Sequence, residues 1–164
     1  MKNNMKTKVM FATLSLLVFA SCRKDEDVVI DDGNQSDVVT IDENTTHLEG
    51  PMRGTLTSGK TYYLTGDLIV PEGEEIIVEE CVTIIAEGDG GPIGPEITVH
   101  GSFISKGTES CPNLFSVPVN MRTEANTFAG LWGGIQCSDK AKLVYLKWTR
   151  MEYLGGEGGP GTPR

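Results

Sequence analysis

Few side chains in this 164-residue sequence have the types and spacing that chemistry requires. His47 and His100 are the only histidines and no Cys-x-x-C pair occurs, so the ligand set of a zinc site is missing. Glu87 and Asp89 stand close together in a glycine-rich loop, but calcium needs roughly six to eight oxygen ligands and two carboxylates do not supply them. We therefore expect no catalytic residue, no metal and no cofactor.

Two tryptophans are the candidate binding residues. Trp132 and Trp148 would stack on a sugar ring if their indole faces were exposed. The alternative for each is a packing role in the core or at a corner of the chain. Exposure in the folded protein decides between the two roles.

Three cysteines lie in the part of the chain that we expect to fold. Cys81 stands in an apolar run and is expected to be a small buried hydrophobe. Cys111 and Cys137 both lie at the edges of apolar runs, and they form the predicted disulfide. One thiol must stay free because the number of cysteines is odd.

Residues 1–21 have the features of a secretory signal peptide. Lys2, Lys6 and Lys8 precede the apolar run VMFATLSLLVFA. A helix over that run would rise about 18 Å, which is too short for a hydrocarbon core of about 30 Å. The run therefore reads as the core of a cleaved signal and not as a membrane span.

The end of this signal, LVFASC, resembles a bacterial lipobox with Cys22 as the acceptor of the lipid. The resemblance implies cleavage before Cys22 and acylation of the new N-terminus, which would give the several acyl chains that stable anchoring needs. The next residues include Lys24, Asp25 and Glu26, which resemble the surface-export signal of Bacteroidetes-type lipoproteins. This implies a protein anchored in the outer membrane and facing the cell exterior.

Charge divides the remaining chain. The sequence has 23 acidic and 14 basic residues, and this excess of acids excludes nucleic acid as a partner because phosphate binding needs a cationic face. Residues 22–49 contain nine of the acids and no aromatic residue, a composition that predicts a disordered tether. We expect the folded domain to span residues 50–156 and a flexible Gly/Pro tail to span residues 157–164.

Short β-branched runs separated by glycine-rich breaks predict an all-β domain. The runs span residues 62–70, 75–86, 96–105, 131–137 and 142–154. The runs begin roughly twenty residues apart, which suits the coils of a parallel solenoid. Runs that are apolar on both faces also suit a covered sheet. Periodicity alone leaves two architectures open, a parallel β-helix and a small antiparallel β-sandwich.

Four elements resemble right-handed parallel β-helix lipoproteins of the Bacteroidetes type. They are the segments YYLTGDLIVPEG, ITVHGSFISKGT, LWGGIQ and LKWTRMEYLGG, and they occur in the family's order over about residues 50 to 156. The resemblance implies a pectate-lyase-like β-helix that has few coils and is truncated relative to the family.

Two functional hypotheses follow from these patterns. In the first, a surface lipoprotein presents a β-helix wall that binds polysaccharide or a protein partner without catalysis. In the second, the chain is the N-terminal fragment of a polysaccharide lyase or hydrolase whose catalytic coils lie beyond residue 164.

Overall fold

The computed structural model describes residues 37–87 and 94–155, which contain β-strands, two short 3-10 turns and no α-helix. The strands and turns are β1 (Val39–Thr40), β2 (His47–Leu56), β3 (Thr61–Val70), β4 (Glu75–Val78), β5 (Thr83–Ala86), β6 (Glu96–Val99), β7 (Ser102–Lys106), β8 (Asn113–Ser116), η2 (Val119–Met121), η3 (Glu124–Asn126), β9 (Gly134–Cys137), β10 (Leu143–Lys147) and β11 (Thr149–Met151). The all-β prediction is thereby confirmed. The signal, Cys22, Lys24, Asp25, Glu26 and the tail at 157–164 lie outside the described residues.

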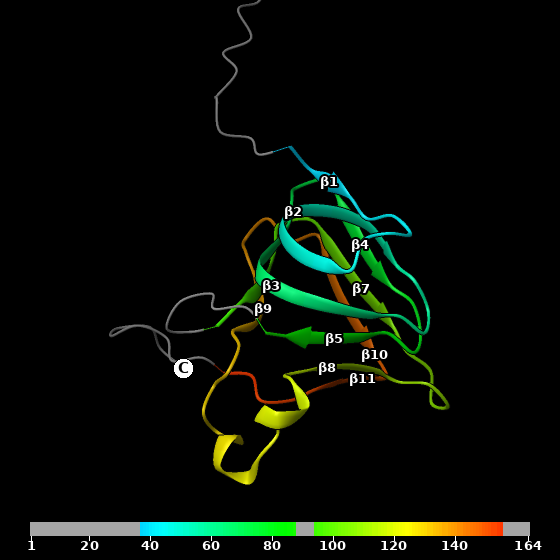
Figure 1. Cartoon of the computed structure of the whole chain (residues 1–164). Helices are drawn as coiled ribbons and strands as arrows, with labels where there is room; N and C mark the ends of the chain where they lie inside the picture. The colour runs from blue at the N-terminus through cyan, green and yellow to red at the C-terminus, as the bar shows by residue number, and fades with distance from the viewer. Residues whose placement is uncertain (1–36, 88–93, 156–164) are drawn as a thin grey trace, which may run out of the picture. The chain divides into compact units, whose positions relative to one another are not determined.

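All strand pairs in these two ranges are parallel, and they form three rows. The first row is β2–β4–β7–β10, the second is β2–β3–β5–β8–β11, and the third is β3–β6–β9. The long strands β2 and β3 each take part in two rows, so the rows enclose one interior (Figure 1). The antiparallel β-sandwich that the sequence left open is therefore wrong.

The interior is filled by every second side chain of each row. In β4, Ile76 and Val78 are fully buried, while Ile77 between them is partly exposed. Parallel register places inward residues of successive strands above one another, so Ile76 lies beside Phe103. Phe103 meets Phe115 of the second row edge to face, with ring centroids 6.2 Å apart.

Register partners move further apart in sequence along the stack. In the first row, Gly54 pairs with Ile76, which is close to the predicted spacing of roughly twenty residues. Phe103 pairs with Val144, a much longer interval that holds the segment with η2 and η3. Regular spacing thus describes only the first turns.

The folded part begins earlier than residue 50, so the predicted disordered tether over 22–49 is wrong for residues 37–49. The side chain of Leu48 is fully buried and that of Ile41 is 7% exposed. The backbone N–H of Ile41 donates to the carbonyl oxygen of Arg53 at 2.8 Å. Acidic composition suggested disorder, but two well-spaced apolar residues are enough here to fix the segment against the core.

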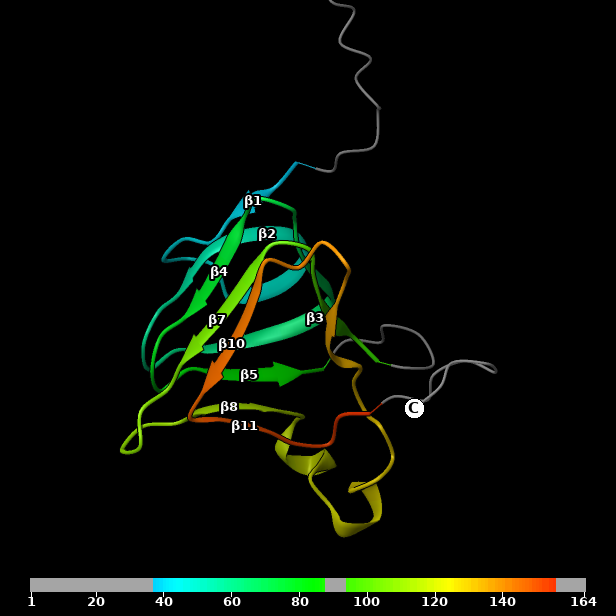
Figure 2. The same ribbon diagram turned by 180° about the vertical axis from the view of Figure 1, so that it is seen from behind.

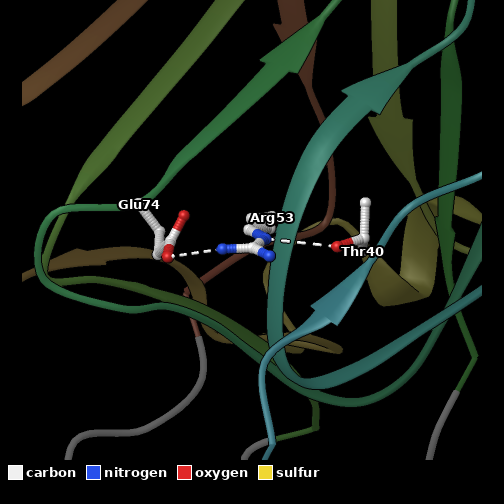
Figure 3. A network of polar contacts seen from close by, with 3 residues as sticks. All are labelled: Thr40, Arg53 and Glu74. Atoms are coloured by element: carbon white, nitrogen blue, oxygen red, sulfur yellow. Dashed lines mark hydrogen bonds and ion pairs between the residues drawn. The ribbon is translucent and has the colours of Figure 1, made fainter.

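Arg53 ties this first segment to the stack (Figure 3). Its Nε donates to Thr40 Oγ1 at 3.1 Å, and its Nη1 pairs with Glu74 Oε1 at 2.9 Å. The contacts join β1, β2 and the turn before β4. Because Arg53 is about half exposed, this ion pair adds little to stability.

The disulfide joins Cys81 to Cys111, so the predicted Cys111–Cys137 pair is wrong. Cys81 lies in the turn before β5 with φ 62°, and Cys111 lies just before β8. Since β5 and β8 pair in parallel register, their preceding turns are adjacent and the two Cα atoms lie 4.9 Å apart. Cys137 lies in β9, in the third row, and is free and exposed.

Candidate functional site

Exposed aromatic and basic side chains gather on the last turn of the stack. Figure 2 shows β4, β7 and β10 side by side, and within the described residues β10 pairs only with β7. In β10, alternation directs Val144 and Leu146 toward the core and Leu143, Tyr145 and Lys147 outward. We call Leu143, Tyr145, Lys147 and the following Trp148 the β10 face.

The aromatic rings of this face are accessible to a ligand. Tyr145 is 45% exposed and Trp148 is 49% exposed. Tyr145 is in register with Ile104 of β7, which is in register with Ile77 of β4. A partly exposed apolar ladder therefore leads across the outer surface of the first row to the tyrosine.

Trp148 is positioned by the backbone of the corner between β10 and β11. Its φ of 47° is the left-handed conformation that non-glycine residues rarely adopt. Its carbonyl oxygen accepts the N–H of Asn113 at 2.8 Å. A Cβ on Gly107 would lie 2.2 Å from that same oxygen, so the corner can approach only because residue 107 is glycine.

A buried network of hydrogen bonds lies next to the corner between β10 and β11. The Nδ2 group of Asn113 donates to Ser105 Oγ at 2.8 Å, and its Oδ1 accepts the Val82 N–H at 2.9 Å. Ser105 Oγ also hydrogen-bonds Thr149 Oγ1 at 2.7 Å. Satisfied networks of this kind rigidify the backbone around them, which holds Trp148 in a defined place.

The charge of the domain changes sign along the stack. Residues 37–87 contain eleven acidic residues against two Lys and Arg, whereas residues 137–155 contain four Lys and Arg against two acids. Lys147 lies in register with Lys106, both are exposed, and neither forms an ion pair with a described residue. The end of the stack that bears the β10 face is therefore locally cationic.

Glu152, after β11, is the one partly buried carboxylate near this end with a shifted pKa. Burial alone would raise the pKa of Glu152, but hydrogen bonds from Arg150 and Ser116 and the charges of Arg150 and Arg122 outweigh it. The pKa is lowered from its ordinary value of 4.5, so Glu152 is a carboxylate at neutral pH. It is held as an ion-pair partner of Arg150 and not as a proton donor.

Trp132, the other predicted stacking residue, does not belong to an exposed site. It is 1% exposed, and its Nε1–H donates to the carbonyl oxygen of Glu152 at 2.8 Å. The prediction of ligand stacking is wrong for Trp132, because the ring fills the core where the third row meets the second. His100 lies in the turn between β6 and β7, and its Nδ1 forms a hydrogen bond with Ser138 Oγ at 2.8 Å.

The sequence pointed to Trp148 and Lys147 but not to Tyr145 or Lys106. The signal was present in KLVYLKW, where Leu143, Tyr145 and Lys147 share parity. The significance of Lys106 depends on strand register, which spacing alone does not give.

The described ranges hold neither a metal-binding cluster nor a membrane-spanning helix. Residues 37–87 and 94–155 contain no cluster of three His, Cys, Asp or Glu side chains that could hold a metal ion. The same ranges include no helix that is long and apolar enough to span a bilayer.

Searches against protein-family models, curated proteins and solved structures found no match to this chain. The feature of the described residues that bears on function is the exposed aromatic and cationic end of the parallel β-stack.

Proposed function

We propose that this chain is a lipoprotein of the outer membrane, anchored through Cys22 and facing the cell exterior, whose right-handed parallel β-helix presents a binding wall. The wall takes polysaccharide or a protein partner and carries out no catalysis. The parallel rows around one core support the β-helix, and the lipobox-like LVFASC supports the anchor.

One observation carries the binding role: Trp148 and Tyr145 remain half exposed on a rigid framework. Aromatic rings held by a scaffold lose little conformational entropy on binding, and their faces pack against sugar rings or apolar side chains. Lys147 and Lys106 add hydrogen-bond donors and positive charge beside the rings.

The anchor is tested with Cys22→Ala. The unaltered protein should take up labelled fatty acid and sediment with membranes, and the variant should do neither. Surface exposure predicts that protease added to intact cells removes the domain. Protection in intact cells, with cleavage only after lysis, would place the protein inside.

The wall is tested with Trp148→Ala, measured by retention of the full chain on immobilised envelope polysaccharides. We expect retention by at least one polysaccharide and its loss in the variant. The matched control is Phe128→Ala, which removes another exposed ring that follows η3 and does not belong to the β10 face. Turnover of an acidic polysaccharide by this chain would instead support the rival proposal, a fragment of a lyase or hydrolase.

A further inference from the structure

We propose that the edge of β10 that no other described strand covers accepts an extended, acidic segment of a partner protein, which adds to the first row as a further parallel or antiparallel strand. This inference names the partner of the proposed wall and so rests on its binding role, but it does not depend on the lipid anchor.

The first support is the state of the edge itself. Among described strands, β10 lies at the end of its row with β7 as its one neighbour. The N–H of Leu143 donates to the carbonyl oxygen of Gly101, just before β7, at 3.5 Å. Because successive residues of a strand turn their N–H groups to opposite sides, those of Leu143 and Tyr145 face β7, and those of Val144 and Leu146 point to the open side, where an added strand would meet them.

The second support is the uncovered apolar end of the core. Leu146 continues an inward ladder with Ser105 and Val78, both fully buried, yet Leu146 itself is 40% exposed. Leu143, Tyr145 and Trp148 are exposed around it. A further strand would cover Leu146 with its own inward side chain, which favours an apolar residue at every second position of the partner.

The third support selects an acidic partner. Lys147 and Lys106 lie side by side in register, an arrangement that repels, and no described carboxylate pairs with either. A Glu or Asp on the added strand would meet Lys147 on the outward face and relieve this repulsion. Alternating apolar and acidic residues are therefore the chemistry that fits both faces of the edge.

The test separates the backbone of Leu146 from its side chain. Leu146→Pro and Leu146→Val both shorten the side chain, but only Leu146→Pro removes the open-side N–H. The probe is a fluorescent octapeptide of alternating glutamate and valine, and the control peptide alternates lysine and valine. Anisotropy is measured with the full chain and each variant after circular dichroism shows that they fold.

We expect the acidic peptide to bind more tightly than the basic one, and its affinity to fall with added salt. Loss of one backbone hydrogen bond should place the affinity of Leu146→Pro about tenfold below that of Leu146→Val. Lys147→Glu, which leaves the backbone intact, should also weaken binding of the acidic peptide. This variant tests the inference if the proline variant does not fold.

Several results would overturn the inference. Equal affinity of Leu146→Pro and Leu146→Val for the acidic peptide would show that no backbone hydrogen bond forms at this edge, and equal binding of both peptides would remove the case for an acidic partner. Self-association of the chain that Leu146→Pro abolishes would assign the edge to a second copy. Binding of polysaccharide with no binding of the acidic peptide would refute this inference alone, whereas absence of both would refute the proposed wall as well.

Discussion

Removing the Cys81–Cys111 disulfide should strongly destabilise the domain. The bond closes a loop with a sequence separation of 30, which in the chain-entropy treatment corresponds to about 3–4 kcal/mol. For a domain of this size that is a fall in Tm of roughly 10–20 °C. Thermal denaturation followed by circular dichroism should show this fall in the full chain with Cys81→Ala and Cys111→Ala combined.

The matched control is Cys137→Ala, which removes the free exposed thiol and should leave Tm nearly unchanged. Tryptic peptide mapping without reduction should show residues 61–106 disulfide-linked to residues 107–122. Cys137 should be found alkylated in a separate peptide. Linkage of Cys111 to Cys137, or a Tm for the double variant equal to that of Cys137→Ala, would refute the inferred alignment of the turns before β5 and β8.

Three further changes test the core and the corner. Gly107→Ala places a Cβ against the Trp148 carbonyl and should cost about 1–3 kcal/mol in urea unfolding, with a shift in Trp148 fluorescence; an unchanged spectrum and stability would contradict the close approach. Leu56→Ala should cost about 2–5 kcal/mol by the same assay, because the side chain is fully buried. Glu152 has a lowered pKa in the folded state, so its carboxylate stabilises the fold at pH values above its ordinary pKa of 4.5. This contribution disappears as the pH falls through the folded-state pKa. The stability difference between the unaltered chain and Glu152→Gln should therefore shrink between about pH 7 and about pH 3, and a difference that is constant with pH would contradict it.

Much of the strand content could be predicted because alternation is a local signal. The apolar runs at 62–70, 75–86, 96–105, 131–137 and 142–154 correspond to β3, β4 with β5, β6 with β7, β9, and β10 with β11. Three of these runs contain a turn that was not predicted from the sequence, such as that at His100 and Gly101. Parallel pairing itself followed from family resemblance and not from periodicity.

Strands β2 and β8 were not predicted, because their sequences lack a clear strand pattern. β2 contains Gly50, Pro51 and Gly54, which are ordinarily breakers but are tolerated here near the start of the stack. Gly50 and Gly54 adopt positive φ where β2 passes from one row to the next. β8 consists of only four residues after Pro112, too short for a clear pattern.

The disulfide and the binding face were beyond sequence reasoning for a shared reason. Pairing Cys81 with Cys111, or Lys106 with Lys147, requires knowledge of which strands are neighbours and in what register. Insertions such as the segment holding η2 and η3 change the spacing between neighbours without changing the register. Trp132 and Trp148 are likewise indistinguishable in sequence, yet one is buried and the other exposed.

The central claim is that the end of the stack bearing Trp148 is a binding surface. Acrylamide quenching of tryptophan fluorescence in the full chain tests it directly, because Trp132 is 1% exposed and the quenchable signal of the domain belongs to Trp148. Addition of an envelope polysaccharide that the chain retains, or of the acidic peptide, should protect this signal from the quencher. Quenching that stays unchanged while either ligand is bound at saturation would place the binding surface elsewhere on the protein.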